Sequence, residues 1–157
     1  MMTTARDIMT TGIISVLPDT PVNQVADLLA AQRFGAVPVM DADRNVLGIV
    51  TEDDLLQRVA DVHLPRHITF LGSIIYLENP HHFEEEAQKI LGMTAQDIME
   101  KQFSTITPDA PLSTIAAKML AEDLRRMMVI DNDGKLVGII TRADIVRQMA
   151  HTGDGAK

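Results

Sequence analysis

The sequence predicts an α+β fold made of two copies of one β-α-β-β-α unit, related by pseudo-twofold symmetry. Of the 52 residues from 5 to 56, 16 are identical to the residue 90 positions later, and the alignment needs no gap. Both copies also show the same order of apolar runs, Pro-Asp turns and helical patterns. Because such a small sheet must bury one face, we expect the two copies to pack through their sheets as one unit.

The repeat divides the chain into four segments. We expect the first repeat at residues 1–56, an ordered connecting insert at 57–94, the second repeat at 95–150 and a frayed tail at 151–157.

Each repeat is expected to begin with a short strand and a helix. The strands are predicted at residues 13–17 and 103–107, and a Pro-Asp turn follows each of them. The helices start with proline at the first helical position, Pro21 or Pro111, where the missing N–H costs nothing. Their buried faces follow the spacing i, i+3, i+4, i+7. The predicted core residues are Val22, Val25, Ala26 and Leu29 in the first copy and Leu112, Ile115, Ala116 and Met119 in the second.

A β-hairpin and a final helix complete each repeat. The first hairpin pairs residues 36–40 with 46–50, and the second pairs 127–130 with 136–140, in each case across an Asp-rich turn. The final helices are predicted to begin after Thr51 and after Thr141.

The insert carries a predicted helix at residues 83–91, with an acidic first turn that favours the helix dipole. It also holds Phe70, Tyr76 and Phe83, so the region from Phe70 to Phe83 is a candidate surface for a partner or for self-association. His81 and His82 beside three glutamates suggest a metal-dependent hydrolase, but adjacent histidines point in different directions on a regular backbone. A surface loop followed by a helix start is the favoured interpretation.

The composition limits the classes of partner. The chain has 157 residues, 46% of them hydrophobic, and a formal net charge of −8. An acidic chain is poorly suited to the backbone of a nucleic acid or to an anionic membrane, and we expect neither as a partner. The absence of cysteine excludes a disulfide framework, a thiolate nucleophile and a Cys-based metal site. The first residues do not have the pattern of a signal peptide, so we expect a cytoplasmic protein.

Each final helix begins with Thr-x-x-Asp: Thr51 with Asp54, and Thr141 with Asp144. A phosphate could bind the free N–H groups of such a helix start and the threonine hydroxyl. The carboxylate on the same turn could accept hydrogen bonds from both ribose hydroxyls. The same pattern is also a capping box, in which the two side chains satisfy the amides of the helix itself. Its duplication in register favours a binding site.

These residues resemble a tandem pair of cystathionine-β-synthase (CBS) domains, also called a Bateman module. The resemblance rests on Asp-Ile-Met before each first strand, on Ala-Val-Pro-Val at 36–39, and on Gly-Ile-(Val/Ile)-Thr-x-x-Asp at 48–54 and 138–144. The strand glycine of that motif would let a ligand or another backbone approach closely. The family implies a non-catalytic module that binds adenine nucleotides or related ligands in clefts between the repeats. It also implies that two modules pair as a disc-like homodimer.

Basic residues distinguish the second copy. Arg142 follows Thr141, and Arg125 and Arg126 stand 90 residues after a glycine and an alanine. We therefore expect three guanidinium groups near the phosphate of the Thr141 site, or else a solvated charged surface.

Acidic residues distinguish the first copy. Glu52 and Asp53 occupy its helix start and would repel a phosphate unless Mg²⁺ or an arginine of the other repeat intervenes. The second site is accordingly the preferred one.

The adenine base is expected to lie between aliphatic side chains, because only 3% of the residues are aromatic. No catalytic residue and no metal ligand is predicted. The candidate ligand-binding residues are Thr141, Asp144, Arg142, Thr51, Asp54, Ile13, Ile14, Ala36, Val37, Pro38 and Arg126.

The predicted function is that of a regulatory module and energy sensor. It would bind AMP, ADP or ATP, with or without Mg²⁺ and without a catalytic cofactor, and would signal to a separate, unknown regulated partner protein. The alternative is a ligand-free structural scaffold whose duplicated fold provides dimerisation. Glu52, Asp53 and the Met127-Met128 pair in place of Val37-Pro38 favour this alternative.

Overall fold

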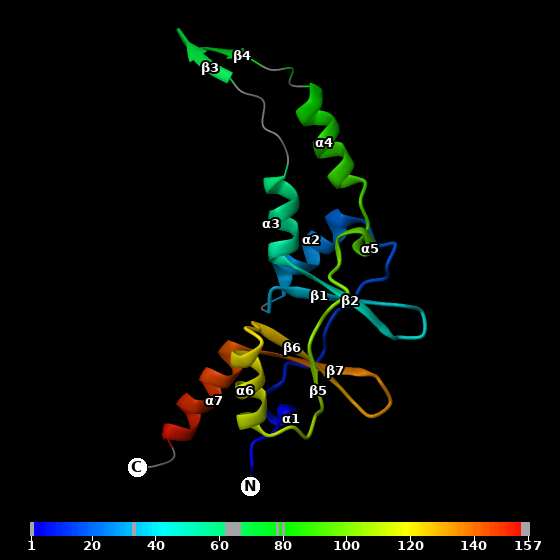
Figure 1. Ribbon diagram of the computed structural model, residues 1–157, viewed down its shortest axis with the longest axis vertical. Coiled ribbons are helices and arrows are strands. Elements are labelled where there is room, and N and C mark those ends of the chain that lie inside the picture. The colour runs from blue at the N-terminus through cyan, green and yellow to red at the C-terminus, as the bar shows by residue number, and fades with distance from the viewer. Residues whose placement is uncertain (1, 33, 62–66, 78, 80, 155–157) are drawn as a thin grey trace.

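The computed structural model describes residues 2–32, 34–61, 67–77, 79 and 81–154 (Figure 1). The first repeat contains α1 (Ala5–Ile8), α2 (Val22–Ala31), β1 (Ala36–Met40), β2 (Val46–Thr51) and α3 (Glu52–Ala60). The insert contributes β3 (His67–Phe70), β4 (Ser73–Tyr76) and α4 (His81–Leu91). The second repeat contains α5 (Ala95–Ile98), β5 (Thr105–Ile106), α6 (Leu112–Ala121), β6 (Arg126–Ile130), β7 (Leu136–Thr141) and α7 (Arg142–Asp154).

The two hairpins have the same strand register. Val37 lies opposite Val50 in the β1–β2 pair, and Met127 lies opposite Ile140, 90 positions later, in the β6–β7 pair. Both pairs are antiparallel, and both contain an irregularity before the last residue of the first strand. The predicted hairpins are confirmed, and the duplication of the sequence extends to individual backbone pairs.

Alternation of side chains along the strands divides the interior into three clusters. Val37 and Val39 pack in the first repeat, and Met127 and Val129 pack in the second. The residues of the opposite strand face meet between the repeats, which confirms packing through the sheets. The buried members of this third cluster are Ala36, Ile49, Met128 and Ile139.

Five of the eight predicted core positions of α2 and α6 are buried, whereas Ala26, Leu112 and Ala116 are only partly buried. Val25 and Ile115 are fully buried at equivalent positions. The helix starts differ from the prediction by one residue. Pro21 and Pro111 are the N-cap residues, with extended backbone, and not the first helical residues.

The predicted first strands are shorter than expected. Residues 13–17 form no strand, because Val16 alone pairs with β1, through Val39, before the chain turns. Its counterpart β5 is limited to Thr105 and Ile106. At the other end of the chain, α7 continues to Asp154, so residues 151–154 extend the helix and are not a frayed tail.

The N-terminal helix packs against the second repeat. The backbone N–H of Ala5 donates to the carbonyl of Ala110 at 2.9 Å, and Thr10 pairs with Ile139 of β7. Ala5 is fully buried in the apolar cluster of the second repeat.

The helix α5 makes the reciprocal exchange and packs against the first repeat. The N–H of Ala95 donates to the carbonyl of Thr20 at 2.8 Å, and Glu100 pairs with Ile49 of β2. Ala95 and Ile98 are buried in the cluster of the first repeat. Each structural half therefore contains the opening segment of the other repeat, which the division at residues 1–56 and 95–150 did not anticipate.

The strand glycines permit this exchange. A Cβ on Gly48 would lie 2.6 Å from the carbonyl oxygen of Glu100, and one on Gly138 would lie 2.7 Å from Cγ of Met9. Both distances are too short for real contacts, so each glycine accommodates the exchanged segment. Of the two explanations for these glycines, the approach of another part of the chain is the correct one.

The described part of the insert contains a hairpin and a helix, and α4 includes the predicted helix 83–91. In the hairpin, Phe70 lies opposite Ser73, and the turn residues Leu71 and Gly72 both have positive φ, 48° and 79°. The hairpin projects away from the two repeats (Figure 1). Its apolar side chains are largely exposed, with Leu71 at 90%. Among the described residues, no helix is long and apolar enough to cross a membrane.

Candidate functional site

The Thr-x-x-Asp motifs form capping boxes at the starts of α3 and α7. At Thr141, the backbone N–H and the hydroxyl both donate to Oδ2 of Asp144, at 2.7 and 3.0 Å. Thr51 makes the same two bonds to Asp54, at 2.8 and 3.0 Å. Each aspartate side chain thus satisfies groups of its own helix start. The capping interpretation is confirmed, and it leaves Oδ1 of each aspartate outside the capping bonds.

Two further capping boxes occur in the chain. Thr4 with Asp7 starts α1, and Thr94 with Asp97 starts α5, with the same hydrogen-bond geometry. Accepting these bonds lowers the pKa of both carboxyls. The motif alone is therefore no evidence for a ligand, and the surroundings of each copy must distinguish the sites.

The Thr141 box lines a cleft of about 590 Å³ between the repeats, which we call the Thr141 cleft. Thr141 and Asp144 meet the segment after α1 there, and Phe34 and Gln32 close one side. The lining residues of the Thr141 cleft are Thr10, Thr11, Gly12, Ile14, Gln32, Phe34, Thr141, Ala143, Asp144 and Arg147.

The Thr51 box lines an equivalent cleft of about 260 Å³, the Thr51 cleft. Six of its twelve lining positions correspond to those of the Thr141 cleft at the 90-residue offset. Asp54 is not itself among the lining residues, which are Ile49, Thr51, Asp53, Glu100, Gln102, Phe103, Ser104, Asp123, Leu124, Arg125, Arg126 and Met128.

Asp144 is the most buried ionisable residue at these clefts, with only 8% of its surface exposed. Arg147, one turn along α7, forms an ion pair with its Oδ1. This arginine is largely exposed and lines the cleft. Sequence reasoning missed Arg147, although its spacing of three residues from Asp144 on a helix is a signal for such a pair.

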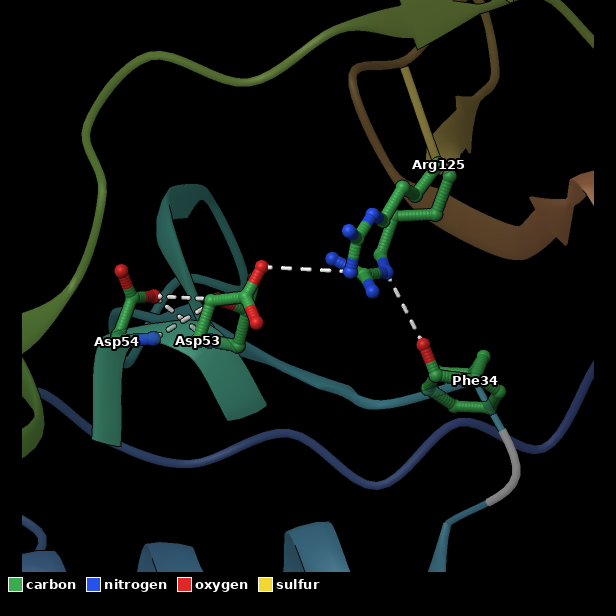
Figure 2. A network of polar contacts seen from close by, with 6 residues as sticks. Phe34, Asp53, Asp54 and Arg125 are labelled. Atoms are coloured by element: carbon green, nitrogen blue, oxygen red, sulfur yellow. Dashed lines mark hydrogen bonds and ion pairs between the residues drawn. The ribbon is translucent and has the colours of Figure 1, made fainter. Parts of the chain in front are cut away.

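The arginine cluster does not lie where the sequence predicted it. Arg125 and Arg126 extend from the second repeat into the Thr51 cleft and not into the Thr141 cleft. Nη1 of Arg125 lies 3.4 Å from a carboxylate oxygen of Asp53, and Nε of Arg126 donates to the carbonyl of Phe34 at 3.0 Å (Figure 2). The reason is strand alternation: Arg126 shares the face of β6 that carries Met128, and that face meets the other repeat.

An arginine of the other repeat therefore lies beside the acidic start of α3. Such an arginine, or else Mg²⁺, is the condition that the sequence predicted for phosphate binding at the first site. Burial and the charge of Arg125 lower the pKa of half-buried Arg126, while Asp53, Glu52 and Glu100 oppose that shift. The guanidinium remains charged, because its ordinary pKa is far above neutrality.

Glu100 adds a further carboxyl to the lining of the Thr51 cleft, close to the carboxyl of Asp54. Partial burial, followed by the hydrogen bond and repulsion from Asp54, raises the pKa of Glu100, while Arg126 acts in the opposite direction. Thr10 occupies the equivalent place in the Thr141 cleft. Glu100 was not predicted, because the exchange of α5 brings it to the cleft.

Arg142 lies outside both clefts. Its Nη2 contacts Asp123 at 3.0 Å and its Nε donates to the carbonyl of Leu124 at 2.6 Å, so it joins the segment after α6 to the start of α7. These two partners direct Arg142 away from the clefts, and its role at a phosphate stays a prediction that this arrangement does not favour.

The predicted base-binding residues are separated by the structure. Ile14 is half exposed and lines the Thr141 cleft, whereas Ile13 packs between the repeats and lines another hollow near Lys135. Ala36, Val37 and Pro38 are fully buried in β1 and line none of the described clefts. Their side chains fill the core on both faces of the strand, which excludes direct contact with a base in this arrangement.

The comparisons with known proteins agree with this architecture. The family model of the CBS domain matches residues 5–61 and 95–151, which together are more than half of the chain. The chain belongs to the CBS domain family. It is a tandem CBS pair, as the sequence predicted.

Two similar proteins come from Arabidopsis thaliana. The chloroplastic CBS domain-containing protein CBSX1 is 32% identical to this CBS pair over 146 residues, which cover 88% of this chain and 61% of CBSX1. The crystal structure of CBSX2 in complex with AMP is 26% identical, with a TM-score of 0.71, and covers 96% of this chain and 98% of that one.

A third structure supports the fold alone. The CBS domain pair of protein MJ0100, solved with 5-methylthioadenosine and S-adenosyl-L-methionine, is 20% identical with a TM-score of 0.72, and covers 97% of this chain and 99% of that one. Within the residues that our structure describes, no group of three or more His, Asp or Glu side chains is arranged to hold a metal ion.

Proposed function

We propose that this CBS pair is a regulatory module that binds an adenine nucleotide between its repeats. The observation that carries the proposal is the position of Thr141 and Asp144. Of the four capping boxes, theirs combines a nearly buried carboxylate with a wide cleft between the repeats. The AMP bound to the similar protein CBSX2 supports the choice of ligand.

Asp144 is the proposed ribose ligand in the Thr141 cleft. Its Oδ2 accepts the capping bonds, so Oδ1, now paired with Arg147, is the atom available to the ribose hydroxyls. Ribose binding would release Arg147, whose exposed guanidinium could then approach the phosphate. Ile14 and Phe34 supply apolar surface for the base. Mg²⁺, where the nucleotide brings it, would be coordinated mainly by phosphate oxygens and water.

Binding would act as a signal by favouring one arrangement of the two repeats over another. Both clefts combine residues of both repeats, so a ligand bound there contacts both structural halves. The receiver would be a separate, regulated protein. In this proposal the chain itself is not an enzyme, because the polar side chains at its helix starts are used for capping and for binding.

The proposal is tested by thermal unfolding against AMP, ADP and ATP, with and without Mg²⁺. A nucleotide present at 100 times its Kd stabilises a protein by about 2.7 kcal/mol, which raises Tm by about 5–10 °C at this size. If no nucleotide raises Tm, the ligand-free scaffold is the better explanation. That alternative is supported by the capping bonds, which already occupy Oδ2 of each aspartate.

We further propose that two CBS pairs associate through α3 and α7. The exposed apolar residues Leu56 and Val59 of α3 recur at the 90-residue offset as Val146 and Met149 of α7, and all four are 65–66% exposed. In Figure 1, α3 and α7 lie on the side of the molecule opposite to the turns of the β1–β2 and β6–β7 hairpins. A duplicated apolar surface of this kind suits a self-complementary interface about a twofold axis.

Replacing Val59 and Met149 together by lysine should produce a monomer, because two charges per chain would then have to be buried in the interface. Sedimentation equilibrium measures the mass directly. Leu120→Lys on α6 is the matched control, since Leu120 is 76% exposed but lies on another helix, and it should leave the dimer intact. A double variant that still sediments as a dimer would exclude this interface.

The insert hairpin is the proposed surface for the regulated partner. Phe70, Leu71, Ile74, Tyr76 and Leu77 are each more than half exposed. Replacing residues 66–80 by a short Gly-Ser linker should abolish capture of the partner protein in pull-down experiments and leave the nucleotide-induced Tm shift unchanged. Capture of the same partner by both forms would rule out the hairpin as the docking surface.

A further inference from the structure

The two clefts occupy equivalent places but differ in charge. Positions 125 and 126 are arginines, whereas the equivalent positions 35 and 36 are glycine and alanine. Asp53 and Glu100 in the Thr51 cleft correspond to Ala143 and Thr10 in the Thr141 cleft. Because the backbone registers are the same, the difference between the clefts resides in these side chains.

The Thr51 cleft presents two guanidinium groups to an incoming anion. Arg125 is 70% exposed, and its only ion pair within the described residues is with Asp53, which is itself 68% exposed. Arg126 is half-buried and fixed by its bond to the carbonyl of Phe34. Ser104 and Gln102 add neutral polar groups to the same cleft. Its lining carboxylates are those of Asp53, Glu100 and Asp123, and Asp123 is paired with Arg142. Exposed pairs such as Arg125–Asp53 are weak, so a multiply charged anion can replace the aspartate.

Among described residues, one cation lines the Thr141 cleft, whereas two line the Thr51 cleft. Of the lining residues that the structure describes, Arg147 is the one cation of the Thr141 cleft, and it already pairs with the nearly buried Asp144. The remaining lining residues are neutral, with Thr10, Thr11 and Gly12 along one side. This cleft suits a ligand with a hydroxyl-rich, weakly charged body, since each additional phosphate would lack a cationic partner.

We propose that the two clefts select their ligands by charge. The Thr51 cleft takes a polyphosphate, as in a nucleoside triphosphate, whose phosphates bind Arg125 and Arg126 and displace Asp53. The Thr141 cleft takes adenosine compounds with at most one phosphate. The claim that adenosine compounds bind in the Thr141 cleft rests on the proposed function. The claim that a polyphosphate binds in the Thr51 cleft depends only on the two arginines.

The carboxylate of Asp53 then acts as an internal competitor of the phosphate. Its removal frees Arg125 and also removes a negative charge from the helix start where the anion would bind. The chain itself supplies the appropriate replacement, because Ala143 occupies the equivalent position in the Thr141 cleft. Asp53→Ala is therefore expected to strengthen polyphosphate binding, whereas Arg125→Gln is expected to weaken it.

The experiment is isothermal titration of the full chain with ATP, adenosine and inorganic tripolyphosphate. Compared with wild type, Arg125→Gln should bind ATP and tripolyphosphate about tenfold more weakly, and Asp53→Ala should bind them about threefold more tightly. Adenosine binding should change by less than about twofold in both variants. Arg126→Gln should show the same loss of affinity as Arg125→Gln. Arg125→Gln is the preferred variant, because Arg125 is exposed and its replacement leaves the contacts of half-buried Arg126 intact. Arg6→Gln is the matched control, because Arg6 is 61% exposed and pairs with Asp109 outside both clefts.

Each outcome is decisive. Equal ATP and tripolyphosphate affinities in wild type, Arg125→Gln and Asp53→Ala would overturn the inference, and so would a parallel loss of adenosine binding. If the wild type binds neither adenosine nor any adenine nucleotide, the proposed function fails, and the tripolyphosphate titrations still decide the role of the arginines. Binding of tripolyphosphate without ATP would identify free polyphosphate as the ligand of the Thr51 cleft.

Discussion

Asp144→Ala is expected to weaken binding of AMP by about 30-fold, equivalent to about 2 kcal/mol. The variant loses charge-assisted hydrogen bonds to the ribose hydroxyls. It is also expected to lose about 1 kcal/mol of stability, because Asp144 accepts two bonds from Thr141 at the start of α7. Titration calorimetry measures the affinity, and urea unfolding measures the stability.

Asp97→Ala is the control that separates these two effects. Asp97 makes the same capping bonds with Thr94, at 2.8 and 3.0 Å, but it lines none of the described clefts. It should therefore show the stability loss with unchanged nucleotide affinity. If Asp144→Ala retained wild-type affinity, the ribose contact would have to be elsewhere, with Asp54 as the first residue to test.

Gly48→Ala should lower the free energy of unfolding by about 3 kcal/mol, at the upper end of the range for overpacking. The added Cβ would lie 2.6 Å from the carbonyl oxygen of Glu100 and 2.8 Å from Sδ of Met99. Relief requires displacement of the exchanged segment, which breaks the two backbone bonds between Ile49 and Glu100, at 3.0 and 2.8 Å. We expect calorimetry to show a decrease in Tm of about 10 °C for this variant.

Gly92→Ala provides the comparison. A Cβ at Gly92 would have its nearest contact at 3.4 Å, an ordinary distance, so that variant should be close to wild type in stability. Gly138→Ala should fall between the two, because its clash is with the side chain of Met9, which can partly move aside. Equal stability of Gly48→Ala and Gly92→Ala would refute the role of Gly48 in the exchange.

The sequence was sufficient to predict the repeated architecture and insufficient to predict which repeat each segment joins. The 90-residue offset and the buried spacing of Val25 and Ile115 led to the correct hairpins and helices, because these patterns are local. The positions of α1 and α5 could not be obtained in this way, since equivalent surfaces exist on both repeats and local patterning does not distinguish them.

The candidate site was predicted in part for a related reason. The Thr-x-x-Asp helix starts were identified correctly, because capping is a local property. Arg125 and Arg126 were assigned to the wrong cleft, because they were counted with their own repeat. The alternation that places Arg126 on the same strand face as Met128 was present in the sequence and would have indicated the other repeat.

The exchange of α1 and α5 also affects how the protein can form during synthesis. The first structural half lacks buried Ala95 and Ile98 until synthesis has passed residue 98. The second half needs Ala5, the earliest buried residue of the chain, which must wait for partners more than 100 residues away. Neither half can complete its core before the segment that it receives from the other repeat has been synthesised, so the two halves must fold together and not one after the other.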